Sequence, residues 1–389
     1  MGDGFGSVKT DLMPWNMKSV QDQRKELLEL ACAPRANRSE LCRRFGISRK
    51  TLYKWLAVSS EGSEPKDRTR RPIRSPKRSS GEVEEQVVAL REAHRWGGRK
   101  ISRRLDDLGG PHVAPSTVTE ILRRHELLDG PRSGHKRDHQ RFEREHPNDL
   151  WQMDFKGHFG LNSGDRCHPF GCLDDCSRYC LDLKACSNER AVTVQDILTL
   201  VFQTYGLPNQ ILADNGGPWG ARSSRQLTPL LIWLSQLGIQ VIHGRPYHPQ
   251  TQGKQERFHH SLQFEVLDRR GFADLSECQK AFDEFRHVYN TQRPHESHGL
   301  QTPARLYTLS PRAFPKGQLK DPDYDTEFFV RKVQYGGILH FKAAEFRVGK
   351  CLHGHLVGVK PANKDGTYNV YFGRSVVTQI DLRQNNQTQ

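Results

Sequence analysis

The sequence of 389 residues contains no uninterrupted apolar run long enough to cross a bilayer as a helix. Its opening stretch, MGDGFGSVKTDLMPW, lacks the apolar segment of a secretory signal peptide. We therefore expect a cytosolic protein with no membrane-embedded part. The sequence also lacks a G-x-x-x-x-G-K-[S/T] loop and a G-x-S-x-G turn, which argues against ATP as a ligand and against serine hydrolase chemistry.

Paired cysteines are missing as well. The nine cysteines are an odd number and include no C-x-x-C pair, so reduced thiols are predicted. Cys172, Cys176 and Cys180 recur at every fourth position, which leaves a zinc site as an alternative. Reduced thiols are favoured, because the surrounding residues are typical of strand and turn and the spacing departs from that of structural zinc sites.

Positive charge, by contrast, is abundant, with a net charge of +14. The first 150 residues carry 31 Lys and Arg against 22 Asp and Glu, which places +9 of the net charge there. A basic excess concentrated in one part of a chain indicates a polyanionic partner, most often nucleic acid.

Residues 20–57 have the pattern of a helix-turn-helix domain. A corner at Gly46 and Ile47 separates two amphipathic segments, and Ser48 is placed to cap the second one. The second helix of such a motif enters the major groove, so its basic face is a predicted DNA contact; a plain helical bundle with a solvated basic face is the alternative. The basic residues of that helix are Arg49, Lys50 and Lys54.

Two further basic regions follow. Residues 58–80 are rich in Ser, Pro and Arg and predict a linker that either lies along DNA phosphates or only tethers. Residues 82–128 predict a second helix-turn-helix-like DNA-binding domain, with a helical spacer as the alternative, and residues 129–147 predict a basic connector. The candidate DNA contacts here are Arg70, Arg71 and Arg74 in the linker, and Arg99 and Lys100 in the second helical domain.

The pattern changes to α/β at residue 148. Three strands precede alternating helices and strands, so residues 148–310 predict a mixed five-stranded sheet with helices on both faces. One helix is expected to end at Gly206, and Pro229 is expected to kink the next. Residues 325–383 return to short strands with glycine turns and predict a small β-barrel, as a DNA contact or a structural cap. The predicted fold class is therefore multidomain.

Three carboxylates stand out in the α/β region. Asp154 lies inside a predicted strand, where a charge without a partner is costly to bury. Asp214 ends a short buried strand, where α/β proteins tend to place their sites. Glu256 lies in the first turn of a helix, between Lys254 and Arg257. Taken singly, turn chemistry explains Asp214 and the helix dipole explains Glu256.

Taken together, the three carboxylates suit one chemistry. Hard divalent cations prefer oxygen ligands, and two of them about 3.5–4 Å apart can clamp the attacking and leaving oxygens of a phosphoryl transfer. Lys254 and Arg257 are then predicted to hold DNA phosphates beside Glu256.

The segments LWQMDFKG, ADNGGPW and RPYHPQTQGKQERFHHSL resemble the three catalytic motifs of the DDE transposase and retroviral integrase superfamily. HPQTQGKQERFH, together with FGISRKTLYKWL, most resembles insertion-sequence transposases of the IS481 type, followed by the IS3 type. The resemblance covers most of residues 20–310. Two features depart from retroviral integrases: a longer separation of 42 positions between Asp214 and Glu256, and the lack of a His-His-Cys-Cys zinc domain.

The resemblance implies an RNase H-like core with two Mg²⁺ or Mn²⁺ ions, held by Asp154, Asp214 and Glu256 as catalytic ligands. It also implies a transposase that binds the terminal inverted repeats of an insertion sequence, cleaves at the 3′ ends and joins them to target DNA. The implied partners are double-stranded DNA and further copies of the chain, as a dimer or a higher assembly, in the nucleoid of a bacterial cytosol.

Two other readings stay open. A helix-turn-helix regulator that binds DNA without catalysis would retain the core unused, and a nuclease of the RNase H kind would cleave without joining. Adjacent Asp174 and Asp175 are expected to form a surface turn. One of four histidines is expected to contact DNA; these are His243, His248, His259 and His260.

Overall fold

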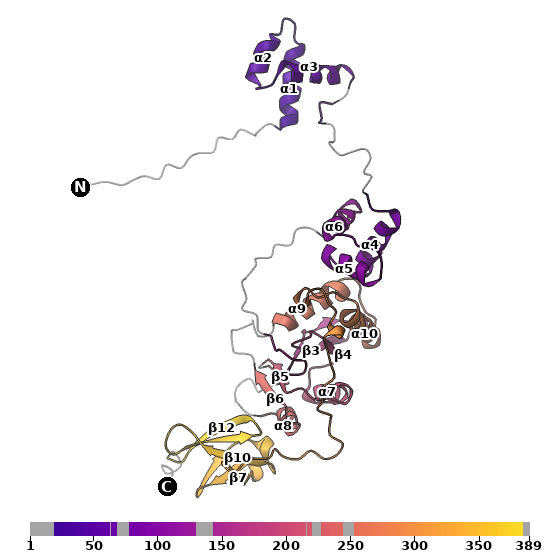
Figure 1. Cartoon of the computed structure of the whole chain (residues 1–389). Helices are drawn as coiled ribbons and strands as arrows, with labels where there is room; N and C mark the ends of the chain where they lie inside the picture. The colour runs from indigo at the N-terminus through magenta and orange to yellow at the C-terminus, as the bar shows by residue number, and fades with distance from the viewer. Residues whose placement is uncertain are drawn as a thin grey trace, which may run out of the picture. The chain divides into compact units, whose positions relative to one another are not determined.

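The computed structural model describes residues 19–62, 64–67, 78–129, 143–214, 216–219, 227–243 and 253–383. The chain divides into two compact units, Met1–Arg78 and Ser79–Gln389. Figure 1 labels the helices and strands of both units. Among the described residues, no helix has the length and apolar character that a membrane span requires.

The first unit is a group of three helices around a small apolar core. Gly46 adopts a left-handed conformation (φ 64°) at the predicted corner, and Ser48 Oγ then accepts a hydrogen bond from the Thr51 amide at 3.1 Å. The N-cap therefore forms where the sequence predicts it. The helices are α1 (Val20–Cys32), α2 (Arg38–Arg44) and α3 (Arg49–Ser60), and their shared core contains Leu27, Ala31, Cys42 and Leu52.

The second unit begins with three more helices. They pack around Trp96, Ile101 and Val118, and Val288 from a later helix joins the edge of this core. The helical group thus contacts the α/β region that follows it. These helices are α4 (Gly81–His94), α5 (Gly98–Asp107) and α6 (Pro115–Arg124).

The α/β region contains the predicted mixed sheet. Its strand order is β4-β3-β1-β5-β6, with the short β2 at the edge of β3; β1 runs antiparallel to β3 and parallel to β5. The two-residue β2 adds a sixth strand to the five that the sequence predicts. The strands are β1 (Leu150–Phe155), β2 (Phe159–Gly160), β3 (Arg166–Asp174), β4 (Cys180–Cys186), β5 (Gln210–Ala213) and β6 (Gln240–His243).

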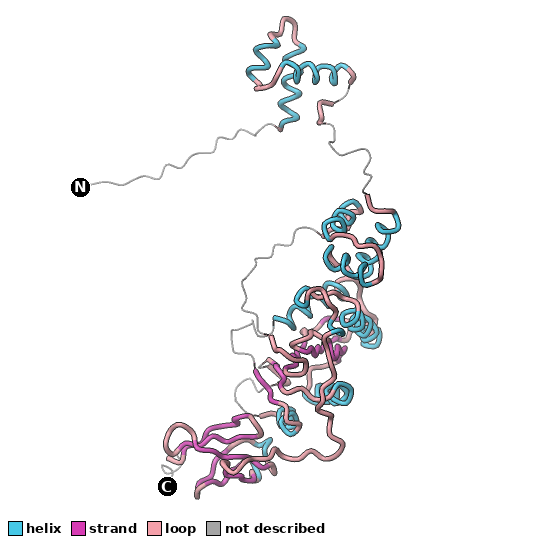
Figure 2. The backbone as a smooth tube through the Cα atoms, in the orientation of Figure 1, coloured by secondary structure: helices cyan, strands magenta, loops and turns pink. Residues whose placement is uncertain are grey.

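Helices cover both faces of this sheet, as Figure 2 shows in cyan around magenta strands. The alternation of side chains along β3 separates two cores: Cys172 packs with α7 and α8, whereas Leu173 packs with α9 and α10. The helices are α7 (Ala191–Tyr205), α8 (Pro229–Gln236), α9 (Gly253–Leu262) and α10 (Leu275–Thr291); a π-helical turn, η2 (Gln263–Leu267), extends α9.

Two predictions about helix ends have different outcomes. Gly206 terminates α7 with φ 79°, as expected. Pro229 does not kink a helix; it begins α8, with Thr228 as the N-cap. A proline fits the first helical position because the amide hydrogen it lacks would have no partner there. The expectation of a kink was therefore wrong.

The C-terminal strands form a four-stranded antiparallel sheet, in the order β12-β11-β10-β7, and a separate hairpin of β8 and β9. The sheet and hairpin share one apolar core, which also includes Ile232 of α8. Closure into a barrel stays a prediction. These strands, yellow in Figure 1, are β7 (Phe329–Lys332), β8 (Ile338–Phe341), β9 (Ala344–Arg347), β10 (Leu356–Pro361), β11 (Thr367–Phe372) and β12 (Ser375–Asp381).

Candidate active site

Asp154 and Asp214 belong to neighbouring parallel strands. The register pairs Leu150 with Gln210 and Gln152 with Leu212. Continued by two residues, the same register sets Asp154 level with Asp214, which follows the last residue of β5. Residues that lie level on adjacent parallel strands point to the same face of the sheet. The two aspartates are therefore directed to one side of the sheet.

The pKa of Asp154 is shifted by its burial and by neighbouring acidic side chains. Burial first, and then the negative charge of Asp214, raise it from its ordinary value to about 7, against a hydrogen bond from the Phe155 amide that lowers it. The charges of Glu189 and Glu256 add to the increase. Asp154, Asp214 and Glu256, from three separate elements, thus interact electrostatically.

Asp214 is held in place by its own turn and by β6. The Gly216 amide donates a hydrogen bond to its Oδ1 at 2.9 Å. His243 Nδ1 lies 2.9 Å from its carbonyl oxygen, which makes His243 a hydrogen-bond donor to the Asp214 backbone. His243, the last residue of β6, therefore helps to fix the backbone of Asp214.

Helix α9 brings His259 beside Asp154 while Glu256 stays exposed. His259 Nδ1 lies 3.9 Å from Asp154 Oδ2. Burial, with the charge of Lys156, lowers the pKa of His259 to about 4, so its imidazole is neutral near pH 7. The contact is therefore no ion pair at that pH. His260 is exposed on the next position, and His248 lies outside the described residues.

A close approach between α9 and β3 sets the helix over the sheet. Gln255 is fully buried, and its Nε2 donates a hydrogen bond to the Gly171 carbonyl at 3.0 Å. Gly171 pairs with Asp154 across the two strands. A Cβ atom on Gly171 would lie 2.7 Å from Gln255 Nε2 and 3.2 Å from the Phe258 ring.

Gly171→Ala is therefore expected to lower the free energy of unfolding by about 1–3 kcal/mol, because the added methyl forces α9 away from the sheet. The matched control is Gly160→Ala in β2, where the added Cβ meets nothing within 4 Å. Urea unfolding of the two variants and the wild type measures the difference. Equal stability of both variants would show that α9 does not depend on this close approach.

Asp174 and Asp175 do not form a surface turn, so that expectation was wrong. Both are buried. Asp174 accepts hydrogen bonds from the Asn148 amide at 2.7 Å and from the Ser177 amide and hydroxyl at 2.8 and 2.7 Å. Asp175 forms an ion pair with Lys254 at 2.6 Å. Long-range partners offset the cost of burying these carboxylates.

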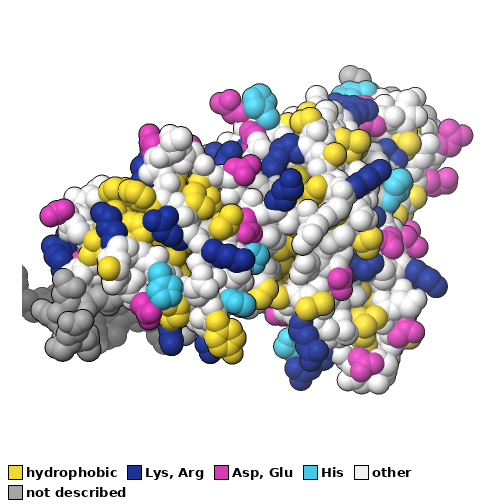
Figure 3. All heavy atoms as spheres, turned by 90° about the horizontal axis from the view of Figure 1, so that it is seen from below, with side chains coloured by type: hydrophobic (Ala, Val, Ile, Leu, Met, Phe, Trp, Pro, Cys, Tyr) yellow, Lys and Arg dark blue, Asp and Glu magenta, His cyan; other side chains and the backbone are white. Residues whose placement is uncertain are grey.

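The predicted DNA contacts lie in different surroundings. Arg49, Lys50 and Lys54 are exposed on α3, Arg99 is exposed at the start of α5, and Arg257 is exposed on α9. On the face shown in Figure 3, Lys and Arg side chains are interspersed with acidic and apolar ones, so charge by itself does not outline a binding surface there. The three linker arginines, Arg70, Arg71 and Arg74, lie outside the described residues.

Lys100 and Lys254 are the two predicted contacts that the structure largely encloses. Burial and the charge of Arg293 lower the pKa of Lys100 to about 8, and the charge of Arg257 acts in the same direction, opposed by Glu265. Lys100 of α5 therefore lies within the electrostatic influence of Arg257 of α9. Lys254 keeps little exposure because it pairs with Asp175.

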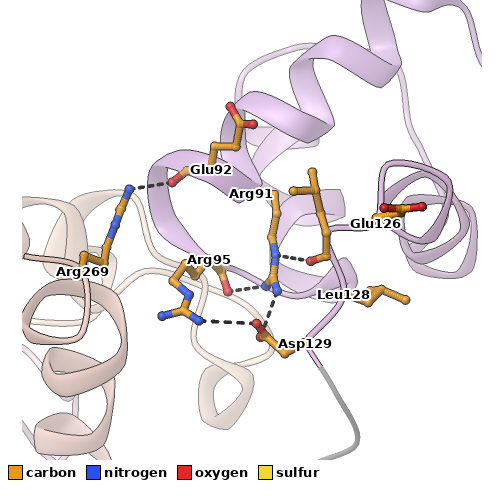
Figure 4. Close-up of a pocket in the computed structure, with 8 residues that line it drawn as sticks. Arg91, Glu92, Arg95, Glu126, Leu128, Asp129 and Arg269 are labelled. Carbon is orange, nitrogen blue, oxygen red and sulfur yellow. Dashed lines mark hydrogen bonds and ion pairs between the residues drawn. The ribbon is translucent and has the colours of Figure 1, made fainter.

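A pocket lies where the helical group of α4, α5 and α6 meets the α/β region (Figure 4). Its lining includes Arg91, Arg95 and Arg269. Arg91 donates to Asp129 Oδ2 at 2.9 Å, and Arg269 donates to the Glu92 carbonyl at 2.8 Å. Next to the pocket, Trp96 Nε1 donates to Glu265 of η2 at 3.3 Å. Because these arginines are paired within the protein, we regard the pocket as an internal junction.

The donor set of the three carboxylates consists of oxygen atoms, which suits a hard divalent cation. A dication would also relieve the repulsion that raises the pKa of Asp154. Within the described residues, no group of three or more His, Cys, Asp and Glu side chains is placed so that it could hold a metal ion. The fit of the three carboxylates to a dication is therefore one of donor chemistry alone, and the same finding leaves the cysteine alternative for zinc without support in those residues.

Comparisons with known proteins give four family matches. Two families described as Integrase core domain match residues 144–249 and 237–303. The IS481 family transposase, C-terminal domain, matches residues 329–388. A Homeodomain-like helix-turn-helix domain matches residues 58–122, which include α4 and α5.

Two curated relatives come from insertion elements. An uncharacterized 39.2 kDa protein of IS476 from Xanthomonas euvesicatoria is 27% identical over 227 residues, which cover 57% of this chain. The match spans 63% of that relative. An uncharacterized 31.7 kDa protein of IS407 from Burkholderia multivorans is 24% identical over 235 residues, covering 57% of this chain and 81% of the relative.

Solved structures of viral integrases are also similar. A simian T-cell lymphotropic virus intasome, in complex with a PP2A regulatory subunit, matches 76% of this chain and 96% of the viral chain at 16% identity, with a TM-score of 0.38. The HTLV-2 integrase catalytic core in complex with magnesium matches 42% of this chain and 99% of the viral domain at 16% identity, with a TM-score of 0.33.

Proposed function

Because the chain belongs to the DDE transposase and retroviral integrase superfamily, with features of the IS481 type, we propose that it is the transposase of an insertion sequence. It binds the terminal inverted repeats, cleaves a phosphodiester with water to free each 3′-hydroxyl, and joins that hydroxyl to target DNA. In the joining step the 3′-oxygen attacks phosphorus, and the displaced target strand leaves with its own 3′-hydroxyl.

The observation that carries this proposal is the electrostatic coupling of three acids from three elements. Asp154 and Asp214 lie on adjacent parallel strands, and Glu256 acts on Asp154 from α9. A largely buried acid whose pKa is raised by burial and by neighbouring charges, as that of Asp154 is, is a candidate for a functional site. The integrase core match covers Asp154 and Asp214, and the second core match covers Glu256.

We assign Asp154, Asp214 and Glu256 as the residues that hold two Mg²⁺ or Mn²⁺ ions. When bound, such ions activate the attacking oxygen and neutralise charge on the phosphate. The neutral imidazole of His259 accepts or donates a hydrogen bond beside Asp154 without adding charge. Arg257 and Lys100 hold the backbone of the DNA strand that enters between α5 and α9.

The other proposed contacts serve recognition. Helix α3 enters the major groove with Arg49, Lys50 and Lys54 toward the DNA, and the linker around Arg70, Arg71 and Arg74 follows the backbone, while Arg99 extends the contact from α5. The C-terminal strands form a small barrel that contacts DNA or acts as a structural cap. Two ends must be joined in concert, so the active form is a dimer or a larger homo-oligomer on the bacterial nucleoid in the cytosol.

The test uses the full chain, Mg²⁺, oligonucleotides that carry the inverted repeats bracketing its gene, and a target plasmid. Covalent joining of the repeat 3′ end to the plasmid supports the proposal. Cleavage without joining supports a nuclease instead. Repeat-specific binding without either reaction supports a non-catalytic regulator.

Lys50→Ala is expected to weaken binding to the repeat by roughly tenfold, because one contact to a base edge contributes about 1–3 kcal/mol. The control is Lys25→Ala, which removes one positive charge from an exposed position of α1. Fluorescence anisotropy with repeat and scrambled duplexes at two salt concentrations separates base from phosphate contacts. An equal effect of both substitutions would remove α3 from the proposed interface.

A further inference from the structure

We infer that Lys254 and Asp175 form a buried pair that positions Glu256, so that Lys254 acts as a positioning residue and not as a DNA contact. This inference rests on the proposed function, because Glu256 is the group whose placement it explains. The pair lies outside the carboxylate cluster and joins α9 to the sheet that carries the two aspartates.

The geometry of Lys254 is that of a fixed internal cation. Its Nζ lies 2.6 Å from Asp175 Oδ1 and donates a hydrogen bond to the Asp175 carbonyl at 3.0 Å. The Lys254 side chain is 13% exposed and that of Asp175 is fully enclosed. An ammonium that binds DNA phosphate keeps its donors for the DNA, whereas Lys254 uses two of its three donors within the protein.

Asp175 is anchored to the strand that bears Asp154. Its Oδ1 accepts a hydrogen bond from Gln152 Nε2 at 2.6 Å, and Oδ2 accepts one from the Arg144 amide at 2.8 Å. Its own amide donates to the Leu150 carbonyl at 2.9 Å. Gln152 stands two residues before Asp154 in β1, so Lys254 is tied, through Asp175, to the strand of the first aspartate.

Gln255, the residue after Lys254, makes a second contact that fixes α9 on the sheet. Gln255 donates to the Gly171 carbonyl at 3.0 Å, and Gly171 faces Asp154 across β1 and β3. Successive residues of an α-helix are about 100° apart around its axis. With Lys254 and Gln255 both held, the direction of Glu256 from the first turn of α9 is determined.

Single and double substitutions of this ion pair are expected to have different effects on stability. Removal of one partner leaves an uncompensated buried charge, which is strongly unfavourable, whereas removal of both charges is often close to neutral. Lys254→Met and Asp175→Asn should therefore each disturb the first turn of α9, and the double variant should recover part of the loss. A lysine that binds DNA gives no such recovery, because its ammonium is absent from both Lys254→Met and the double variant.

The experiment compares the wild type, both single variants, the double variant and Lys280→Met, a control in which an exposed lysine of α10 is replaced. Three quantities are measured on the full chain: amide hydrogen exchange of α9 with α7 as internal reference, DNA affinity with its salt dependence, and the joining rate at saturating DNA. The exchange reference distinguishes a local effect on α9 from general destabilisation.

We expect each single variant to exchange faster in α9 only, to join roughly 10- to 100-fold more slowly, and to bind DNA within about twofold of wild type. The double variant should recover at least a third of the lost rate on a logarithmic scale, which is roughly the coupling that contacting residues show. Lys280→Met should match the wild type in all three quantities.

Two results would overturn the inference. The first is weaker DNA binding with a shallower salt dependence in Lys254→Met while α9 exchange is unchanged, which is the behaviour of a phosphate contact. The second is a wild-type joining rate in both single variants. A third result separates the two proposals: the wild type joins no DNA, yet α9 exchanges faster in the single variants and recovers in the double variant. In that case the proposed function is wrong, and the role of the Lys254–Asp175 pair in fixing α9 is supported.

Discussion

Asp214→Asn is expected to lower the rate of DNA joining by roughly 100- to 1,000-fold, the loss found when one group that stabilises charge in a transition state is removed. An amide keeps the size of the side chain and its bond from the Gly216 amide, but it removes the negative charge that a divalent cation requires. DNA affinity should stay within about twofold of wild type, because the proposed DNA contacts are elsewhere.

The matched control is Asp196→Asn on the exposed surface of α7, which removes one negative charge from a residue outside the proposed metal ligands. Single-turnover joining with saturating DNA separates the chemical step from binding. A wild-type rate for Asp214→Asn would remove this residue from the catalytic set. A loss of DNA affinity equal to the loss of rate would instead assign it to binding.

Asp154→Asn should have the opposite effect on stability without metal ions, raising the free energy of unfolding by about 2–4 kcal/mol at pH 8. The folded pKa of Asp154 is about 7, above its ordinary value, so the folded state binds the proton more tightly than the unfolded state does. Above pH 7 the wild type must keep a charged, largely buried carboxylate beside Asp214, which the variant does not. This change in the free energy of unfolding is an upper range, because the Asp154 side chain is 23% exposed and solvent screens part of its charge.

The pH dependence of that difference follows from the same pKa. The advantage of Asp154→Asn should be full above pH 7, shrink as the pH falls through 7, and vanish below about pH 4, where the carboxyl is protonated in both states. Mg²⁺ should stabilise the wild type at pH 8 and leave the variant unchanged, since bound ligands stabilise the state that binds them. Urea unfolding at pH 8, 6 and 4 tests this; a variant less stable than wild type at pH 8 would contradict the electrostatics.

Much of the site could be predicted from the sequence because its signals are local. Asp154 inside a strand, Asp214 at a strand end and Glu256 in a first turn are each readable from neighbouring residues, and so is the cap at Ser48. Parallel pairing of β1 with β5 then sets two of these residues, Asp154 and Asp214, on one face of the sheet. The mixed sheet with helices on both faces was predictable for the same reason, since its strands and helices alternate along the chain.

What could not be predicted depends on contacts between distant residues. Asp174 and Asp175 read as a turn because their burial relies on Asn148 and Lys254, which are far away in sequence. The sequence also does not reveal that Lys254 pairs with Asp175. Barrel closure depends on pairing between strand edges, and strand patterns do not specify which edges meet. Pro229 was misjudged because the same residue both breaks helices and begins them.

The most direct measurement is anomalous X-ray diffraction from crystals of the protein with repeat DNA and Mn²⁺. We expect two Mn²⁺ peaks, separated by about 3.5–4 Å, with oxygen atoms of Asp154, Asp214 and Glu256 as ligands. Absence of Mn²⁺ from these carboxylates at saturating metal, with DNA bound to the helical domains, would contradict the proposal that the core is a metal-dependent strand transferase.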